Sequence, residues 1–451
     1  MDCIAAIATA PAPSAIGILR LSGDGAAEKA GRVFTPQNGR PLTDQPPRTL
    51  VYGAVSDRDG ALLDHGLAAV FPAGSGFTGE EAVELYCHGS PVVLQEALAA
   101  VFAAGARLAA PGEFTRRAFL HGRMDLTQAE AVMDLIDAET AEAARLAAAQ
   151  GEGSLRRAVE AVYDDLLALA SRFYAVVDYP DEDIEDLSRE DLLAVLDGAS
   201  VRLEALLSTC RRGQIVKHGL PTALIGRPNV GKSALLNALT GLDRALVTAT
   251  AGTTRDTVEE KVRLGGVTLR LIDTAGIRET TDEIEEMGVE RARQAAKGAA
   301  LALFVVDGSG PPTAQDEAAF AAAGQAERVL VVYNKADLPQ NQEMTAKFPG
   351  GVAVSAQTGA GLAELEAAVA ALYPQGAAES GALLTNARQE DAARRAKAAV
   401  DRAREAYVGG LTPDAILADA EEAMSALGEL TGRTAREDIV SQIFQRFCVG
   451  K

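Results

Sequence analysis

The chain has 451 residues, 48% of them hydrophobic and 24% charged, so its length predicts about three domains and its composition excludes a mainly disordered protein. Its 43 Lys and Arg against 63 Asp and Glu give a formal net charge of −20, which excludes a surface-wide basic footprint and limits any RNA contact to a local or shared site. We predict a soluble, cytoplasmic protein with reduced thiols and no zinc ribbon, because the chain starts with the acidic MDCI, has no apolar run near the roughly 20 residues of a membrane span, and has four scattered cysteines without a CxxC pair.

Two strand-like runs mark the first part of the chain. Residues 15–21 (AIGILRL) and 50–55 (LVYGAV) have the side chains of strands, and glycines and prolines separate them from short helical stretches. This pattern predicts an α+β domain over residues 1–118.

Amphipathic helices are predicted over residues 127–210, where the composition shifts to Ala, Leu, Glu and Arg. Apolar side chains recur there at helical spacing: Ala131, Leu135, Ile136, Val159, Val162, Leu166 and Leu169. The segment 179–186 (YPDEDIED) interrupts them, because its proline ends a helix and its acids repel one another. It is either an acidic loop that precedes a helix or a metal or partner site.

The pattern changes again over residues 216–375, to short β-branched runs that are each followed by a loop and a helical stretch. This alternation is typical of a parallel sheet with crossover helices. Helical patterning returns after about residue 387, in a block that is short for an independent core. We therefore predict a multidomain fold in which an α/β domain is inserted into one α-helical domain, formed by residues 119–215 and 376–451.

Residues 226–233 read GRPNVGKS and match the phosphate-binding pattern GxxxxGK[ST]. They follow a predicted strand at 223–225 and open a predicted helix at 234–239, which is the context that this motif requires. Glycines let backbone N–H groups approach phosphates, Lys232 brings a cation to the β and γ phosphates, and the Ser233 hydroxyl is a ligand for Mg²⁺. The sequence therefore predicts a P-loop.

A buried strand at 329–333 leads to the sequence NKAD at 334–337, which predicts guanine as the base. The carboxylate of Asp337 can accept from both N1–H and the exocyclic amine of guanine, whereas adenine offers no matching pair of donors. Ser355 and Ala356, after a strand at 352–354, match the further base-contacting element of GTPases. We therefore expect GTP to be strongly preferred over ATP.

Two segments between these motifs resemble nucleotide switches. A strand at 269–272 ends in DTAG (273–276), where Asp273 reaches Mg²⁺ and the Gly276 N–H can sense the γ phosphate. Upstream, the polar stretch 251–256 contains Thr254, which we assign to the Mg²⁺ shell. The ordered set of motifs predicts a Ras-like α/β GTPase domain.

Ile277 occupies the position at which Ras-like proteins carry the glutamine that orients water. Because a hydrocarbon cannot orient water, either hydrolysis is very slow or another group acts. The acidic candidates in the following stretch are Glu279, Asp282, Glu283, Glu285 and Glu286.

With GRPNVGKS, TATAGTTRD (248–256), DTAGIRET (273–280), NKAD and the terminal FCVGK (447–451), the sequence closely resembles the MnmE (TrmE) family of bacterial tRNA modification GTPases. The similarity extends over essentially the whole chain, through GILRLSG (17–23), TGEEAVEL (78–85), PGEFT (111–115), RAFL (117–120) and LTQAEA (126–131). A GTPase domain followed by a terminal FCxGK is far more specific than a P-loop alone.

The resemblance implies a homodimer that works with an FAD-dependent partner of the MnmG type, as a heterotetramer in which FAD is bound by the partner alone. Together they would build a carboxymethylaminomethyl or aminomethyl group at carbon 5 of the wobble uridine of tRNA, driven by GTP hydrolysis. The one-carbon unit would come from 5-formyl- or 5,10-methylene-tetrahydrofolate bound by the N-terminal domain, which would also serve dimerisation.

By position in the family, the folate would contact Arg20, Glu84, Arg123 and Lys451, of which Arg123 replaces a frequent lysine. The alternative for Arg20 and Glu84 is a structural ion pair. Cys448 would be a reactive thiol beside the folate or, taken without the resemblance, a small hydrophobic residue.

The resemblance also implies a potassium ion beside the phosphates, in place of an arginine finger. Its ligands would come from Asn229, Thr248, Thr250 and Thr253, and the water-orienting carboxylate would be Glu285, with Lys232 as a second catalytic group. Three segments are expected to contact GTP: Asn229, Val230, Gly231, Lys232, Ser233 and Ala234; Thr248, Ala249, Thr250, Ala251, Gly252, Thr253 and Thr254; and Asp273, Thr274, Ala275 and Gly276. Asn334, Lys335, Asp337, Ser355 and Ala356 complete the set.

Two rival functions compete with this interpretation. A ribosome-assembly or regulatory GTPase would carry a basic RNA-binding appendage, and no KH-type GxxG pattern or basic C-terminal block is present in the sequence. A folate-dependent transferase acting alone would not need a full set of GTPase motifs.

Overall fold

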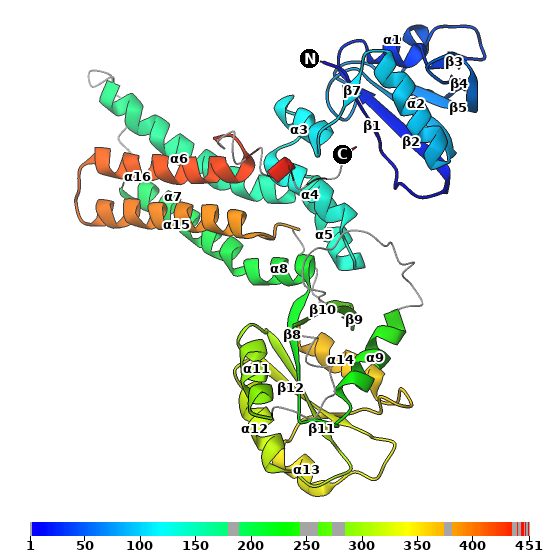
Figure 1. Cartoon of the computed structure of the whole chain (residues 1–451). Coiled ribbons are helices and arrows are strands. Elements are labelled where there is room, and N and C mark those ends of the chain that lie inside the picture. Colours follow the sequence, from blue (N-terminus) through cyan, green and yellow to red (C-terminus); the bar gives the residue numbers. More distant parts are fainter. Residues whose placement is uncertain are drawn as a thin grey trace. The chain divides into compact units, whose positions relative to one another are not determined.

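The computed structural model describes residues 2–178, 189–243, 260–272, 285–373, 381–434, 440, 443–445, 447 and 450. These residues form two compact units, drawn in Figure 1. The first contains Met1–Met133, Gln150–Leu203 and Asp391–Lys451, and the second contains Asp134–Ala149 and Glu204–Glu390.

A seven-stranded sheet forms the N-terminal part of the first unit, with strand order β3-β4-β5-β6-β2-β1-β7. Its strands are β1 (Ile4–Ile7), β2 (Ser14–Ser22), β3 (Phe34–Pro36), β4 (Val51–Ser56), β5 (Leu62–Phe71), β6 (Ala82–Gly89) and β7 (Arg107–Leu108). Neighbouring strands are antiparallel except for the parallel pair β1 and β7.

One face of this sheet packs on helices α1 (Ala26–Gly31) and α2 (Pro91–Ala103), and the short helix η1 (Leu42–Asp44) joins the same core. Because side chains alternate along a strand, Leu19 and Leu21 of β2 enter this core while Arg20 points to the opposite face. Close approach of α2 explains Gly17, where a Cβ atom would lie 2.4 Å from Cδ1 of Leu94. On the opposite face, Ile4 and Ala6 of β1 pack with Ala109 and Phe114, and Arg20 lies beside this small apolar cluster.

Long helices form the rest of the first unit: α3 (Glu113–Leu120), α4 (Leu126–Ile136), α6 (Ser154–Asp178), α7 (Arg189–Ser208), α15 (Ala387–Val408) and α16 (Pro413–Thr431). Helices that precede and follow the α/β segment in the sequence contact one another, since Ser200 of α7 donates to Asp401 of α15 at 2.6 Å. The guanidinium of Arg433, which follows α16, lies 4.9 Å from the ring centroid of Tyr163 on α6. The predicted core positions Val159, Val162, Leu166 and Leu169 are buried.

Leu135 and Ile136 differ from the expected helical core, because they are 48% and 47% exposed. They lie in the last turn of α4. The first turns of that helix carry its packing instead, where Leu126 and Ala129 join a cluster with Phe444 and Phe447. Position along the helix, which spacing alone does not give, decides their exposure.

The second unit contains a six-stranded sheet of order β13-β12-β11-β8-β10-β9, parallel except at the edge strand β9. The strands are β8 (Leu220–Ile225), β9 (Glu260–Leu264), β10 (Val267–Ile272), β11 (Leu301–Asp307), β12 (Arg328–Asn334) and β13 (Val352–Ala353). The helices are α5 (Ala141–Gly151), α8 (Cys210–His218), α9 (Lys232–Asp243), α11 (Glu285–Lys297), α12 (Ala314–Ala323), α13 (Gln342–Lys347) and α14 (Leu362–Leu372).

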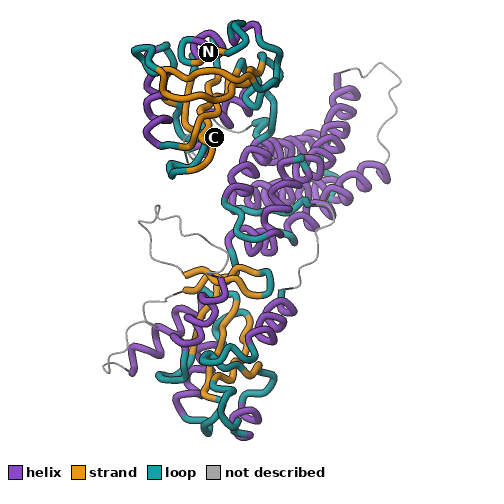
Figure 2. Tube along the Cα trace, turned by 90° about the vertical axis from the view of Figure 1, so that its right-hand side faces the viewer, coloured by secondary structure: helices purple, strands orange, loops and turns teal. Residues whose placement is uncertain are grey.

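Helices cover both faces of this sheet, as Figure 2 shows. One core contains leucines of α9 and α14, and the other contains apolar residues of α11, α12 and α13. Burial on both faces explains the continuous apolar run of β11, in which every residue from Leu301 to Val306 is fully buried. Parallel strands bring their carboxyl ends to one edge, where α/β proteins bind ligands.

The strands expected from sequence are present as β2, β4, β8, β10, β12 and β13, and the chain is confirmed as a multidomain protein that mixes α+β, helical and α/β parts. The domain boundaries at residues 118, 215 and 375 stay predictions. The acidic segment 179–186 lies outside the described residues. Within the described ranges, no helix is both long enough and apolar enough to cross a membrane.

Candidate functional site

The predicted P-loop lies between β8 and α9, and two of its glycines are required by close contacts. A Cβ atom on Gly226 would lie 2.2 Å from the Val305 carbonyl oxygen, and one on Gly231 would lie 2.2 Å from Nδ2 of Asn334. Asn229 between them has a φ of 64°, in the left-handed region that few residues other than glycine adopt. The backbone is thereby bent as an anion-binding loop requires.

Lys232 closes this loop on itself. Its Nζ donates to the carbonyl oxygens of Gly226 at 2.7 Å and Arg227 at 2.9 Å. Burial, and next the charge of Arg227, lower the pKa of Lys232 to about 8. A phosphate in the loop would place negative charge beside this half-buried ammonium and so favour its charged form. The residues present therefore fit a bound nucleotide.

The NKAD segment contacts the P-loop through Asn334, which is 2% exposed at the end of β12. Its Nδ2 donates to the Val230 carbonyl oxygen at 2.8 Å, and its Oδ1 accepts from the Ala356 N–H at 3.1 Å. Ser355 donates to Asp337 at 2.5 Å. The structure therefore brings together three of the predicted segments: the P-loop, NKAD and Ser355-Ala356.

Lys335 is held by a partner that sequence reasoning missed. Its Nζ lies 2.6 Å from Oδ2 of Asp307 at the end of β11, and its φ is 63°. Burial raises the pKa of Asp307, but hydrogen bonds from Lys335 and Ser309 outweigh burial and leave it below its usual value. The pairing follows from the parallel register of β11 and β12, which places Asp307 opposite Asn334.

A second missed contact anchors the P-loop itself. Arg227 donates through Nε to Asp316 at 3.1 Å, and Asp316 is fully buried. The same carboxylate accepts from the Thr313 N–H and hydroxyl and so caps α12. The spacing of Thr313 and Asp316 is a sequence signal for a helix start, but it does not identify Arg227 as a partner.

Several predicted site residues cannot be placed. Of the expected phosphate and metal contacts, 248–254 and 273–276 lie outside the described residues, as do Cys448 and Lys451. Glu285 is the first residue of α11, and Ser233 and Ala234 lie in the first turn of α9.

Arg20 and Glu84 form a second candidate site, on the face of the N-terminal sheet that α1 and α2 leave free. They are opposite each other on β2 and β6, and Arg20 donates to Oε1 of Glu84 through Nε at 3.0 Å and Nη2 at 2.8 Å. The Tyr86 hydroxyl donates to Oε2 of the same carboxylate at 2.6 Å. Burial and then this hydrogen bond raise the pKa of Tyr86 to about 12, so the phenol stays a donor.

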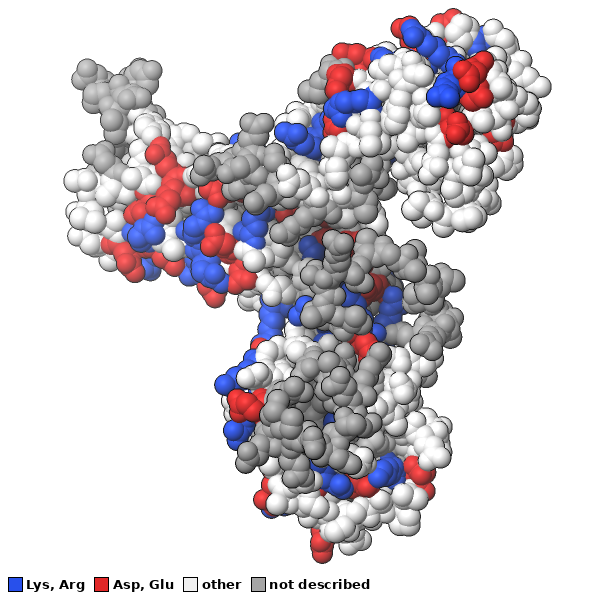
Figure 3. All heavy atoms as spheres, in the orientation of Figure 1, with Lys and Arg blue, Asp and Glu red and all other residues white. Residues whose placement is uncertain are grey.

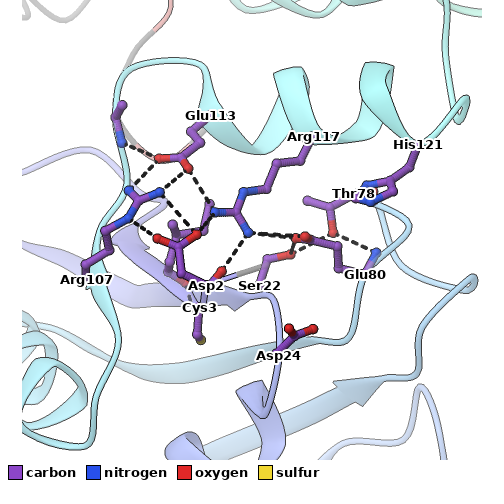
Figure 4. Close-up of polar contacts among 12 residues, drawn as sticks. Asp2, Cys3, Ser22, Asp24, Thr78, Glu80, Arg107, Glu113, Arg117 and His121 are labelled. Atoms are coloured by element: carbon purple, nitrogen blue, oxygen red, sulfur yellow. Dashed lines mark hydrogen bonds and ion pairs between the residues drawn. The ribbon is translucent and has the colours of Figure 1, made fainter.

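A buried polar network holds the neighbouring loop, which connects β5 to β6. Figure 4 shows Arg117 of α3 reaching the carboxylates of Asp2, Glu80 and Glu113, at 2.7, 3.1 and 2.9 Å. Ser22 donates to Glu80 at 2.9 Å. Burial raises the pKa of Glu113, but hydrogen bonds from Arg107, the Ala110 N–H and Arg117 lower it to about 2. The network fixes the loop against the first strands.

Arg123 and the C-terminal tail approach the same domain. Nη1 of Arg123 donates to the Gly74 carbonyl oxygen at 3.4 Å, and a Cβ atom on Gly79 would lie 3.2 Å from Cγ of Arg123. Gly450 has a φ of +100°, and a Cβ atom there would lie 2.6 Å from the Ile7 carbonyl oxygen. Residue 450 therefore lies against the end of β1, the strand that pairs with Arg20 on β2.

Charge on the helical part is balanced locally. Figure 3 shows basic side chains beside acidic ones there. The ion pairs of this part include Arg402 with Asp419 at 2.9 Å and Arg395 with Asp391 at 2.9 Å. Such pairs add no net positive charge to the surface that they occupy.

Comparison with known proteins gives matches over the whole chain. The model of the MnmE helical domain matches residues 126–448, and the model of the GTP-binding protein TrmE N-terminus matches residues 3–123. A tRNA modification GTPase MnmE from Heliobacterium modesticaldum is 43% identical, with 100% of this chain and 99% of the relative covered. Proteins of the same name from Geobacillus thermodenitrificans and Symbiobacterium thermophilum are each 44% identical, with the same coverage.

Proposed function

The chain belongs to the MnmE family of tRNA modification GTPases, and from this premise we propose that it hydrolyses GTP to drive modification of carbon 5 of the wobble uridine in tRNA. The product would carry a carboxymethylaminomethyl or aminomethyl group. The observation that carries the proposal is the pair of hydrogen bonds by which Asn334 of NKAD contacts both the P-loop and Ala356. The chain that makes these contacts matches this family from end to end.

For the nucleotide, we propose GTP with Mg²⁺. Asp337 would accept from N1–H and the exocyclic amine of guanine, and Lys232 would give up its two carbonyl partners to reach the β and γ phosphates. Ser233 has the hydroxyl expected of an Mg²⁺ ligand, and Thr254 and Asp273 would complete that shell. Glu285 would orient the attacking water in place of Ile277.

For the carbon source, we propose a reduced folate, which supplies a one-carbon unit when bound. The donors and acceptors of the Arg20, Glu84 and Tyr86 cluster fit its pterin edge, and Arg123 and Lys451 would pair with its glutamyl carboxylates. Cys448 would lie beside the carried carbon, because Gly450 contacts the same domain. A homodimer, a flavoprotein partner that binds FAD and a cytoplasmic location complete the proposal.

The test of this function uses a strain that lacks the gene and two rescue chains. The full chain should restore the wobble-uridine modification measured by mass spectrometry of tRNA, whereas a chain that ends at Phe447 should not. That shorter chain retains Phe447, which packs with Phe444, so its GTP hydrolysis should stay within about twofold of the full chain. An unchanged level of the modified nucleoside in the deletion strain would instead support a regulatory GTPase without modification chemistry.

We also propose that potassium acts beside the phosphates, held in part by Asn229. The amide oxygen of this exposed side chain has no hydrogen-bond partner among the described residues and is a hard donor of the type that K⁺ takes. Its φ of 64° makes Asn229→Gly the appropriate variant, because glycine accepts this conformation and removes only the amide.

The potassium proposal predicts that wild-type kcat falls at least about tenfold when sodium replaces potassium, since a fixed cation stabilises the transition state. Asn229→Gly should lose most of this potassium stimulation, and Asn229→Asp should keep it. Steady-state rates in matched chloride buffers measure the effect. Equal stimulation of Asn229→Gly and the wild type would remove Asn229 from the ion site.

A further inference from the structure

Glu84 has little capacity left to accept hydrogen bonds. A carboxylate offers about four acceptor positions. Two on Oε1 are taken by Nε and Nη2 of Arg20, and one on Oε2 is taken by the Tyr86 hydroxyl. One position on Oε2 is therefore open to a ligand N–H, and Tyr86 determines where it points.

Phe77 supplies an aromatic surface next to this carboxylate. Its side chain is 38% exposed, whereas Phe114, the second ring beside Arg20, is fully buried. The Arg20 guanidinium carbon lies 5.7 Å from the Phe77 ring centroid and 5.8 Å from that of Phe114. One ring thus supports Arg20 from inside the domain, and the other remains accessible to a ligand.

The position of Phe77 is fixed by the residues that follow it. The Thr78 carbonyl oxygen is 3.0 Å from Nδ1 of His121, the Thr78 hydroxyl is 2.7 Å from that of Ser22, and Glu80 pairs with Arg117 at 3.1 Å. Figure 4 draws this network, and its residues Ser22, Thr78, Glu80 and Arg117 are buried. A ring that is held in place before binding loses little conformational entropy when a flat molecule stacks on it.

We propose that Tyr86 and Phe77 determine the specificity of the Arg20–Glu84 site for a flat heterocycle with an exocyclic amine next to a ring N–H. Tyr86 is a positioning residue that orients the one free acceptor position of Glu84 towards the exocyclic amine, and Phe77 stacks on the ring. The inference rests on the proposed folate function and assigns the pterin end of the folate to this subsite. Release of one Arg20 hydrogen bond would let the guanidinium donate to the neighbouring ring carbonyl of the pterin.

The experiment compares 5-formyltetrahydrofolate with its 2-desamino-2-methyl analogue, which lacks the exocyclic amine, by calorimetric titration or competition. The wild type should prefer the amino compound, and Tyr86→Phe should reduce that preference about tenfold, because the hydrogen bond to a charged acceptor is lost. Phe77→Leu should weaken both ligands about fivefold, and Phe77→Trp should retain binding. Tyr52→Phe is the matched control, since the Tyr52 ring stacks on His65 and lies on β4, two strands from Glu84 on β6.

The outcomes separate this inference from the proposed function. A wild type that binds no 5-formyltetrahydrofolate contradicts the folate proposal itself. If the wild type binds but Tyr86→Phe keeps the preference for the amine, or weakens both ligands equally, Tyr86 does not position Glu84. Wild-type affinity in Phe77→Leu overturns the stacking role. Thermal unfolding and GTP hydrolysis should be unchanged in all of these variants, because none of them touches the P-loop.

Discussion

Replacing Asp337 with asparagine is expected to change the base that the protein selects, from guanine to xanthine. The asparagine amide can donate to the carbonyl that takes the place of the guanine amine in xanthine, whereas it cannot accept from both donors of guanine. Asp337 is exposed in the structure, and a bound base would bury its carboxylate. A polar site that the ligand buries and that then lacks its matching partner discriminates by roughly 10⁴-fold, so kcat/KM should fall by orders of magnitude for GTP and rise for XTP. Ser355 can still donate to the new side chain, because the amide oxygen replaces the acceptor that it uses now.

The measurement is kcat/KM for GTP, XTP and ATP with the wild type, Asp337→Asn and Glu364→Gln. The last variant removes an exposed carboxylate in the first turn of α14 and should behave like the wild type. Equal use of ATP and GTP by the wild type, or an unchanged preference in Asp337→Asn, would contradict the assignment of the base-reading residue.

Loss of the Glu285 carboxylate is expected to stop hydrolysis without releasing the nucleotide. A group that acts on the attacking water in the transition state contributes about 10²- to 10⁴-fold to kcat and hardly affects ground-state binding. Glu285→Ala should therefore reduce single-turnover hydrolysis by that factor, with the Kd for a non-hydrolysable GTP analogue within about twofold of the wild type.

Glu286→Ala is the control for Glu285→Ala, since both residues lie in the first turn of α11. If Glu285→Ala turns over normally, the role passes to one of the other acids of this stretch, of which Glu279, Asp282 and Glu283 lie outside the described residues. A rate loss in both variants would point instead to the helix start as a whole.

The local motifs predicted the α/β part well, because each motif specifies the secondary structure that directly precedes and follows it. GRPNVGKS requires a strand before it and a helix after it, and β8 and α9 occupy those places. The strand that ends at Asn334 was predicted from its β-branched run for the same reason. Contacts between distant segments were not predictable in this way: the pairs of Arg227 with Asp316 and of Lys335 with Asp307 depend on strand order, which a single motif does not specify.

The N-terminal site shows the same limit. Sequence analysis proposed Arg20 and Glu84 either as ligand contacts or as an ion pair, and the register of β2 and β6 makes them an ion pair in this structure. That pairing does not exclude ligand binding, which stays a prediction. Tyr86 and Phe77 were missed because no motif brings them to the site: alternation along β6 places Tyr86 beside Glu84, and the buried network behind the loop places Phe77 beside Arg20.

The side-chain amide of Asn334 links NKAD to the P-loop, because it donates to the carbonyl oxygen of Val230, 104 positions away in the sequence. The same amide accepts a hydrogen bond from the Ala356 N–H. The P-loop and the proposed base-reading segments thus share one group, and Gly231 has no room for a side chain beside it. Mutational effects at these positions cannot be independent, since each change alters the surroundings of the other. Evolution towards another nucleobase would therefore be constrained at Asn334 and freer at Asp337, whose carboxylate contacts Ser355 instead of the P-loop.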